Sequence, residues 1–431
     1  LSVLSRRDRT RERFNILINN YHDNLNPINA SGYFIPERNY LNLNLALSGL
    51  DLTYLSPFLK DFLTISGGSI SGDIGITGQP DRLILESGNS HIDSLLLTPT
   101  FTGVPYIING PVILGQHQIG LQELTLTDPL GASATLSGSI SHNFFRDIHI
   151  DASLGFNNFM CLNTSERDND KFYGSAFASG TLSLSGPLNG LLLDAQVSTN
   201  DRTAIHIPLT SSSSATTTDL ISFTDFSKPA DEEEIETQEE IGRKKSPANI
   251  EIRARANITQ GAELLIEMNK QLGEILRCTG NGNLDVTLHP SRNITDLRGD
   301  YTISDGSYHF AMSIQSRDFL LNEGGTIAFN GDIKNTNLNV GATYRTKASI
   351  STLIADTTSV GNRRNVNCGI QLQGPLTNPE LSFTIDIPDL DPITKGKVEG
   401  ALSTPDKVQK QFMALLISGS FVPDEQSGIV N

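Results

Sequence analysis

Short bursts of alternating apolar and polar residues are the feature that most constrains how this chain can fold. In residues 299–344, apolar side chains occupy every second position in four successive bursts. The positions are Tyr301 and Ile303; Tyr308, Phe310, Met312 and Ile314; Ile327 and Phe329; and Leu338, Val340, Ala342 and Tyr344. A period of two gives each strand one apolar and one polar face. Asn, Asp and Gly separate the bursts, so the stretch predicts a meander of short strands that share one apolar surface.

The same design continues toward the C-terminus and ends in an amphipathic helix. Residues 368–387 alternate again on either side of the turn residues at 374–379. Thr404 suits a helix N-cap, Pro405 suits the first helical turn and Gly419 suits the end of the helix. The apolar stripe of this helix consists of Val408, Phe412, Leu415 and Leu416.

Upstream, one short pattern recurs. It consists of a Gly, then alternating apolar residues, then a second Gly, and it occurs for example in residues 72–78 and 180–187. Each copy is about one strand pair, too small to bury its apolar face alone, so neighbouring copies must share a sheet. Residues 210–248 break the pattern, and their Ser, Thr and acidic runs predict a disordered insertion. We therefore expect a repetitive β segment (1–209), the insertion (210–248) and a C-terminal β domain with the terminal helix (249–431).

The net charge argues against one class of partner, and the cysteine content argues against a disulfide framework. Lys and Arg number 32 against 48 Asp and Glu, so the formal net charge is −16 at pH 7. Binding along nucleic-acid phosphates requires the opposite sign, and we expect no nucleic-acid partner. Cys161, Cys278 and Cys368 are far apart and odd in number, which indicates small buried side chains better than a disulfide framework.

No catalytic or metal-binding motif is evident in the sequence. Neither a phosphate-binding Gly-rich loop nor a nucleophile elbow is present. His142 and His149 lack zinc-protease spacing, and the three aspartates in residues 385–392 lack the spacing of a calcium loop. We therefore expect no enzyme activity, no cofactor and no metal, and we expect the functional feature to be a surface.

The shared apolar face has two interpretations. It is either the interior of a closed β-sandwich or barrel, or the inner face of an open, curled sheet. A secreted adhesin or autotransporter passenger built as a parallel β-helix also accommodates Gly-bounded alternating strands. A polysaccharide-active β-helix enzyme would need clustered carboxylates on one face, whereas the polar positions here are mostly Ser, Thr, Asn and Gln.

Several motifs in order resemble the C-terminal domain of the TamB family, the translocation and assembly module of Gram-negative bacteria, related to AsmA-like proteins. They are Tyr-His-Phe at 308–310, the run at 319–332, Gly-Pro-Leu-Thr-Asn-Pro at 374–379 and Gln-Phe-Met-Ala-Leu-Leu at 411–416. The run at 319–332 includes the turn residues Gly324, Gly325, Gly331 and Asp332. The ordered resemblance covers roughly residues 281–421, and upstream only the repetitive strand style is similar.

This resemblance implies an all-β fold: a long, U-shaped sheet of many short strands with a hydrophobic inner groove, plus the C-terminal helix. It implies a bridge-like envelope protein that carries phospholipid between the inner and outer membranes. It also implies a TamA-like outer-membrane barrel as partner, with unfolded outer-membrane proteins as clients. The protein would lie in the periplasm, and an N-terminal inner-membrane anchor would be missing from this chain, which begins without Met.

The resemblance also indicates which residues would act. The helix stripe Val408, Phe412, Leu415 and Leu416 would dock the partner. The expected groove positions are Leu284, Val286, Leu288, Tyr301, Ile303, Tyr308, Phe310, Ile327, Phe329, Leu338, Val340, Ile370, Leu372, Leu381, Phe383 and Ile385.

Overall fold

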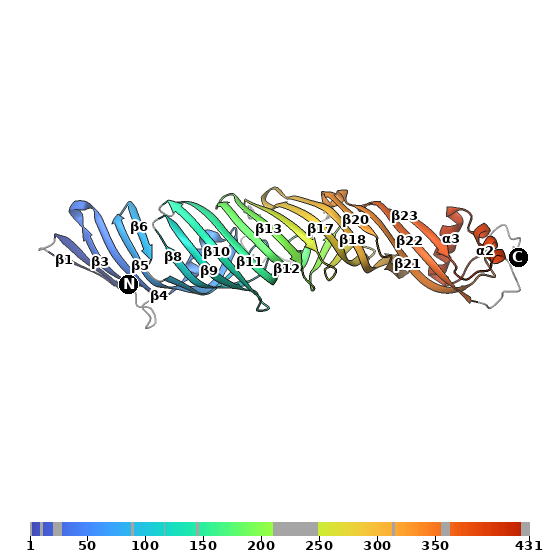
Figure 1. Cartoon of the computed structure of the whole chain (residues 1–431), viewed down its shortest axis with the longest axis horizontal. Helices are drawn as coiled ribbons and strands as arrows, with labels where there is room; N and C mark the ends of the chain where they lie inside the picture. The colour runs from blue at the N-terminus through green and yellow to red at the C-terminus, as the bar shows by residue number, and fades with distance from the viewer. Residues whose placement is uncertain are drawn as a thin grey trace, which may run out of the picture.

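The computed structural model describes residues 2–8, 12–19, 28–87, 90–115, 117–143, 146–209, 249–312, 315–354 and 363–423. Within these residues, 23 strands belong to a single sheet. Figure 1 shows an elongated molecule in which the strands follow one another along the long axis and two helices lie at the C-terminal end. The all-β class predicted from the alternation is confirmed. The predicted insertion at 210–248 and the side chain of Ile314 lie outside the described residues.

The elements of the first part are β1 (Ser2–Asp8), β2 (Arg13–Asn19), β3 (Ile28–Ile35), η1 (Pro36–Arg38), β4 (Tyr40–Asp51), η2 (Leu52–Leu55), α1 (Ser56–Leu59), β5 (Leu63–Gln79), β6 (Arg82–Ser87), β7 (Ser90–Pro99), β8 (Tyr106–Leu114), β9 (Gln118–Thr127), β10 (Ser133–Asn143), β11 (Arg146–Thr164), β12 (Tyr173–Pro187), β13 (Leu191–Thr199) and β14 (Ala204–Pro208). Those of the second part are β15 (Ile250–Ile258), β16 (Glu263–Asn269), β17 (Glu274–His289), η3 (Pro290–Arg292), β18 (Ile294–Ala311), β19 (Ser316–Leu321), β20 (Thr326–Gly331), η4 (Ile333–Asn335), β21 (Asn337–Ser349), β22 (Arg363–Pro375), β23 (Glu380–Asp386), α2 (Pro392–Ala401) and α3 (Pro405–Ser418).

Consecutive strands pair antiparallel along most of the sheet. In β4, for example, Leu43 lies opposite Gly32 of β3 and Ile76 of β5. Short connections suffice for antiparallel neighbours, and the frequent Asn, Asp and Gly residues supply their turns. The coils of a parallel β-helix pair in parallel, so this pairing excludes the β-helix passenger architecture.

One step in the sheet is parallel. β13 pairs in parallel with β15, and β14 pairs in parallel with β16. Parallel neighbours need a long connection that returns the chain to the starting edge. Residues 210–248 occupy that position in the chain, between the end of β14 and the start of β15.

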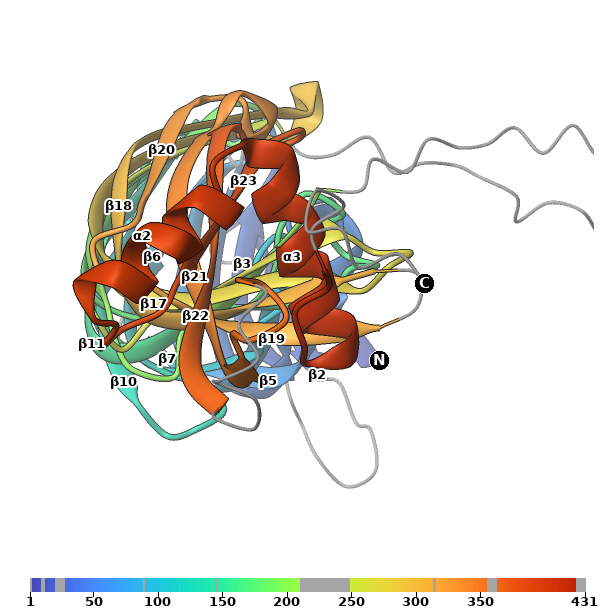
Figure 2. The same ribbon diagram turned by 90° about the vertical axis from the view of Figure 1, so that its right-hand side faces the viewer.

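Beta-bulges accompany the curl of the sheet. Figure 2, viewed along the long axis, shows the strands curling around a common interior with α2 and α3 across the C-terminal end. Register shifts interrupt the pairing of most long strands. A bulge adds a residue to one strand and bends it. At Gly68 of β5, φ is +110° and a Cβ atom would lie 2.3 Å from the Leu95 Cα, so this bend requires glycine.

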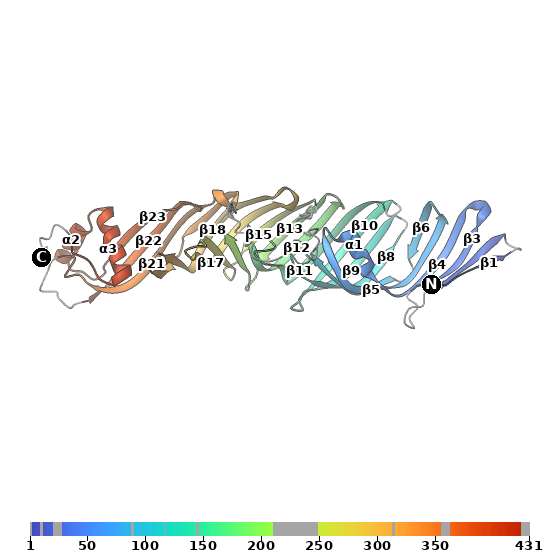
Figure 3. The ribbon, with the colours of Figure 1, turned by 180° about the vertical axis from the view of Figure 1, so that it is seen from behind.

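Two hydrophobic cores occupy the interior of the curl. The first lies between β7 and β12 and includes Val104, Leu124 and Phe159. The second is larger, extends from β14 to α3 and includes Ile266, Tyr301 and many fully buried side chains. Figure 3 shows the sheet from behind, with α2 and α3 beyond β23. The predicted C-terminal helix is confirmed as α3.

A buried carboxylate joins β9, the following turn and β11. Asp128 is 4% exposed and accepts hydrogen bonds from the backbone N–H groups of Leu130, Ala132 and Met160 at 2.8–2.9 Å. Because Asp128→Ala leaves these donors without an acceptor, we expect it to lower the local unfolding free energy by about 2–4 kcal/mol. Amide hydrogen exchange at Met160 measures this change. Asp151→Ala, at an exposed position of β11, is the matched control, and equal effects of the two variants would contradict the assignment.

Candidate functional site

An apolar row crosses the sheet at half-buried positions. We call it the central row, and residues opposite one another across paired strands share a face. From β10 to β18 its members are Leu136, Leu154, Leu182, Ala195, Ala254, Val286 and Leu297, each opposite the next. All seven are only half-buried. The central row lies on the face of the two cores, because Leu136 and Leu154 pack against the first core and Leu297 packs against the second.

The neighbouring row on the opposite face is polar. Each of its members directly precedes or follows a member of the central row. They are Ser137, Ser153, Ser183, Asp194, Arg253, Thr287 and Asp296, again each opposite the next. The two faces of the same strands therefore differ in chemistry along the whole distance, as the period-two pattern predicts.

The apolar face continues toward the N-terminus. Ile16, Gly32, Leu43, Ile76 and Leu85 lie opposite one another in β2 to β6, and all five are half-buried. Neither of the two buried cores includes these residues. The inner face is therefore least covered by protein in the N-terminal part and most covered near the C-terminus.

Most expected groove positions lie inside the second core. Leu288, Tyr301, Ile303, Tyr308, Phe310, Ile327, Phe329, Leu338, Val340, Ile370 and Leu372 are buried, with at most 6% of each side chain exposed. Leu284, Val286, Phe383 and Ile385 are half-buried, and Leu381 is 41% exposed. Val286 belongs to the central row, whereas the Phe383 ring packs 4.6 Å from that of Phe412.

The family turn motif positions β19 and β20 against β18. The backbone N–H of Gly324 donates to the Ile303 carbonyl at 2.9 Å, and the Ile303 N–H donates to the Gly325 carbonyl at 2.8 Å. Gly324 has a φ of +85°, which favours glycine. Gly331 ends β20 opposite Leu297, and Asp332 caps η4 by accepting from the Lys334 N–H. The motif therefore has a structural role: its hydrogen bonds and its cap hold the turns around β20 against β18.

The stripe of α3 faces the chain's own sheet. Phe412, Leu415 and Leu416 are at most 1% exposed, and Val408 is half-buried. The Phe412 ring lies between those of Phe319 and Phe383, with centroid distances of 6.1 and 4.6 Å. A docking role for α3 therefore depends on its outer surface, where Ile417 is 48% exposed.

The three cysteines are free thiols in this structure. Burial raises the pKa of Cys278 and of Cys368 to about 12, and it raises the pKa of Cys161 to about 12 as well. Thiols with such pKa values stay protonated and unreactive at neutral pH. Among the described residues, no cluster of His, Cys, Asp and Glu is arranged to hold a metal ion.

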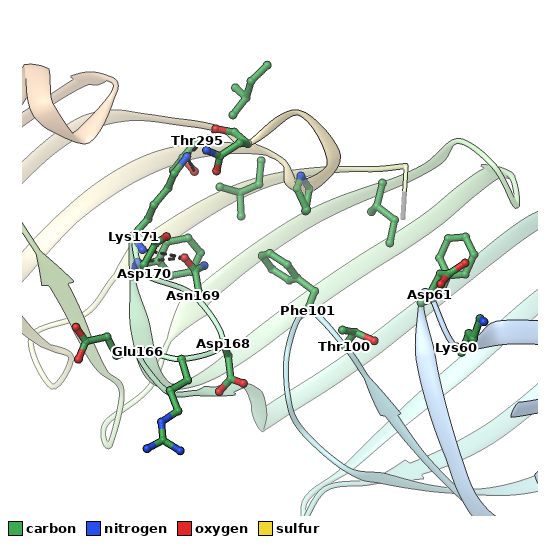
Figure 4. Close-up of a pocket in the computed structure, with 18 residues that line it drawn as sticks. Lys60, Asp61, Thr100, Phe101, Glu166, Asp168, Asn169, Asp170, Lys171 and Thr295 are labelled. Atoms are coloured by element: carbon green, nitrogen blue, oxygen red, sulfur yellow. Dashed lines mark hydrogen bonds between the residues drawn. The ribbon is translucent and has the colours of Figure 1, made fainter. Parts of the chain in front are cut away.

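A cavity of about 510 Å³ lies where several loops meet over the inner face. Figure 4 shows Phe101 near its centre, with Asp61 and Lys60 on one side and Lys171 and Thr295 on the other. Its lining also includes the apolar side chains of Phe62, Phe172, Ile250, Leu288 and Ile294. The lining of the cavity therefore combines apolar side chains with charged side chains of both signs.

Sequence reasoning missed most of the central row. Leu182 lies in the recurring stretch at 180–187, but the expected sites were restricted to the part with the ordered motifs. The period-two signal identifies which residues share a face. It does not tell which part of that face the rest of the chain covers, because coverage depends on the curl and on α3.

These features define an elongated β protein of one curled sheet, with an apolar inner face and a C-terminal end closed by helices. The model of the TamB C-terminal domain matches residues 122–430. The chain belongs to the TamB family, whose members are proteins of the bacterial envelope. The match begins in β9, far upstream of the motifs at 281–421. No curated protein matches the chain. Among the described residues, no helix is long and apolar enough to span a membrane.

Proposed function

We propose that this chain is a non-enzymatic part of a bridge that carries phospholipid between the inner and outer membranes. The central row is the observation that supports this proposal. Its side chains are apolar on successive strands, yet protein covers them only in part. Continuous half-covered apolar surface of this kind is unusual unless a ligand or partner covers it.

The energetics favour acyl chains as that ligand. Exposing a lipid chain to water costs about 0.8 kcal/mol per methylene, so a 16-carbon chain costs on the order of 12 kcal/mol. An apolar face that accepts the chain removes most of this cost while the headgroup remains in solvent. Strands lie about 4.8 Å apart, so roughly 20 successive strands extend on the order of 100 Å. A passive path of this length requires no nucleotide site.

Membership of the family supports the remaining parts of the proposal. The chain acts in the periplasm, in a protein anchored in the inner membrane. Its partner is a TamA-like outer-membrane barrel, and together they support the assembly of outer-membrane proteins. The outer surfaces of α2 and α3 are the proposed contact with the barrel, since they form the C-terminal end of the sheet.

Photo-crosslinking on alternate residues tests the lipid path. A photoreactive residue is placed in living cells at Leu154 or Leu182, and on the opposite face at Ser153 or Thr181. We expect phospholipid adducts by mass spectrometry at Leu154 and Leu182 only, because only these side chains face the interior of the curl. Adducts at all four positions, or at none, would count against a lipid-carrying inner face.

A further inference from the structure

A loop at residues 165–172, which we call the strap, connects β11 to β12. The start of the strap is fixed near the turn between β16 and β17, where Glu166 forms an ion pair with Lys270. Directly after the strap, the Tyr173 hydroxyl donates to Glu267 of β16 at 3.2 Å. Asp168 accepts hydrogen bonds from the Ser165 N–H and hydroxyl, which fixes the loop conformation.

Near the end of the strap, the Lys171 side chain reaches the residues that follow β17. The Lys171 ammonium donates to the Asn293 carbonyl at 2.6 Å and to the Thr295 hydroxyl at 3.4 Å. Asn293 follows β17, whereas Lys270 precedes it, so the strap joins the two ends of β17. Sixteen residues of strand have a contour of roughly 50 Å. The backbone from Glu166 to Lys171, five Cα–Cα steps, spans at most roughly 18 Å, so the strap closes the curl of β17 as a chord.

The cavity lies beneath this chord. Phe62, Phe101, Phe172 and Leu288 provide apolar surface in its lining, and both Lys171 and Asn293 also line it. Lys60, Asp61, Arg167 and Asp170 also line it, and no described ion pair engages these four side chains. A lining that joins apolar surface to both signs of charge matches a phospholipid, which combines acyl chains with a charged headgroup.

The path along the inner face changes at the same level. Upstream of the strap, the central row is half-buried. Beyond Leu297, the inner face passes into the second core, where Ile303, Ile327 and Val340 are fully buried and Phe412 of α3 fills the remaining space. Most of the inner face ahead of a lipid on the central row is occupied by the chain's own buried side chains, and we infer that the lipid passes through the mouth of the curl instead.

We propose that the cavity beneath the strap is a lateral port through which phospholipid leaves or joins the inner face, and that the strap, latched by Lys171 on Asn293 and Thr295, is its gate. This inference rests on the proposed function. It identifies where phospholipid enters or leaves the inner face. It also requires Lys171 to release Asn293 and Thr295 each time a headgroup passes.

The test closes the gate reversibly in the full-length protein in cells. Lys171→Cys and Thr295→Cys are combined with Cys161→Ala, because Cys278 and Cys368 are buried. A short, cleavable cysteine cross-linker then joins positions 171 and 295. We expect delivery of pulse-labelled phospholipid to the outer membrane to fall to the level of cells lacking the protein, and to recover on cleavage. A photoreactive residue at Phe101 should capture phospholipid in the unlinked protein.

The outcomes distinguish failure of the port from failure of the proposed lipid transport. Unchanged delivery after cross-linking would overturn the port, as would capture at Leu182 without capture at Phe101. Either result leaves lipid carriage itself intact. Absence of lipid at Leu182 as well would overturn both proposals. Capture at both positions, with delivery lost on linking and restored on cleavage, supports the port.

Discussion

Leu182→Asp is expected to abolish phospholipid transport while the protein remains folded. Leu182 lies in the middle of the central row, opposite Leu154 and Ala195, and belongs to neither buried core. Because the side chain is half-exposed, a carboxylate there keeps part of its hydration and the sheet tolerates it, within about 1 kcal/mol. An acyl chain passing the same point would have to strip that hydration, at a cost of several kcal/mol.

Thr181→Asp is the matched control. Thr181 precedes Leu182 in β12, is exposed on the opposite face and lies opposite Gly155 and Gln196. The two variants carry the same charge change one residue apart, so a general effect of charge on the sheet would affect both. Phospholipid delivery to the outer membrane, measured beside thermal unfolding of each variant, distinguishes them. Normal delivery with folded Leu182→Asp would refute a path along the central row.

Phe412→Ala is expected to have the largest effect on stability in the chain. The Phe412 side chain is 0% exposed, and its ring packs against Phe319 of β19 and Phe383 of β23. Truncating a buried Phe costs about 3–5 kcal/mol, since burial is lost and a cavity remains. We expect α3 to detach from the sheet, and faster proteolysis between β23 and α3 reports that detachment.

Ile417→Ala provides the comparison on the same helix. Ile417 is 48% exposed, and truncation at a surface position changes stability by about 0.5 kcal/mol or less. Chemical denaturation of both variants, followed by helix and tertiary signals, measures the difference. If the two truncations are equally mild, α3 does not close the second core.

Much of the fold follows from local chemistry that the sequence displays. Alternation identified strands such as β18 and β22, and Thr404, Pro405 and Gly419 correctly bounded α3. α2 was not expected, because its single buried residue, Val398, leaves no apolar stripe to detect. Its N-cap is Asp391, whose pKa is lowered by hydrogen bonds from the Thr394 side chain and backbone and which had been considered only as a calcium ligand.

The functional surface was harder to predict. Leu136 and Leu154 carry the same alternation as Tyr301 and Ile303, yet the first pair is half-buried and the second is fully buried. What separates them is the second core and α3, which come from distant parts of the chain. The strap was not predicted either, because Lys171 and Asn293 are 122 residues apart and no sequence motif links them.

Because the bulges bend the strands locally, the length of the sheet can change without a change in the cross-section of its curl. Many of the long strands bend at a register shift of their own, as β5 does near Gly68, so the curvature is built locally at many points along the sheet. Insertion of one more antiparallel pair with its own bulges would lengthen the sheet by roughly 10 Å and leave the curl unchanged. Duplication of strand pairs in a gene can therefore lengthen such a protein, while the width of its curl stays constant.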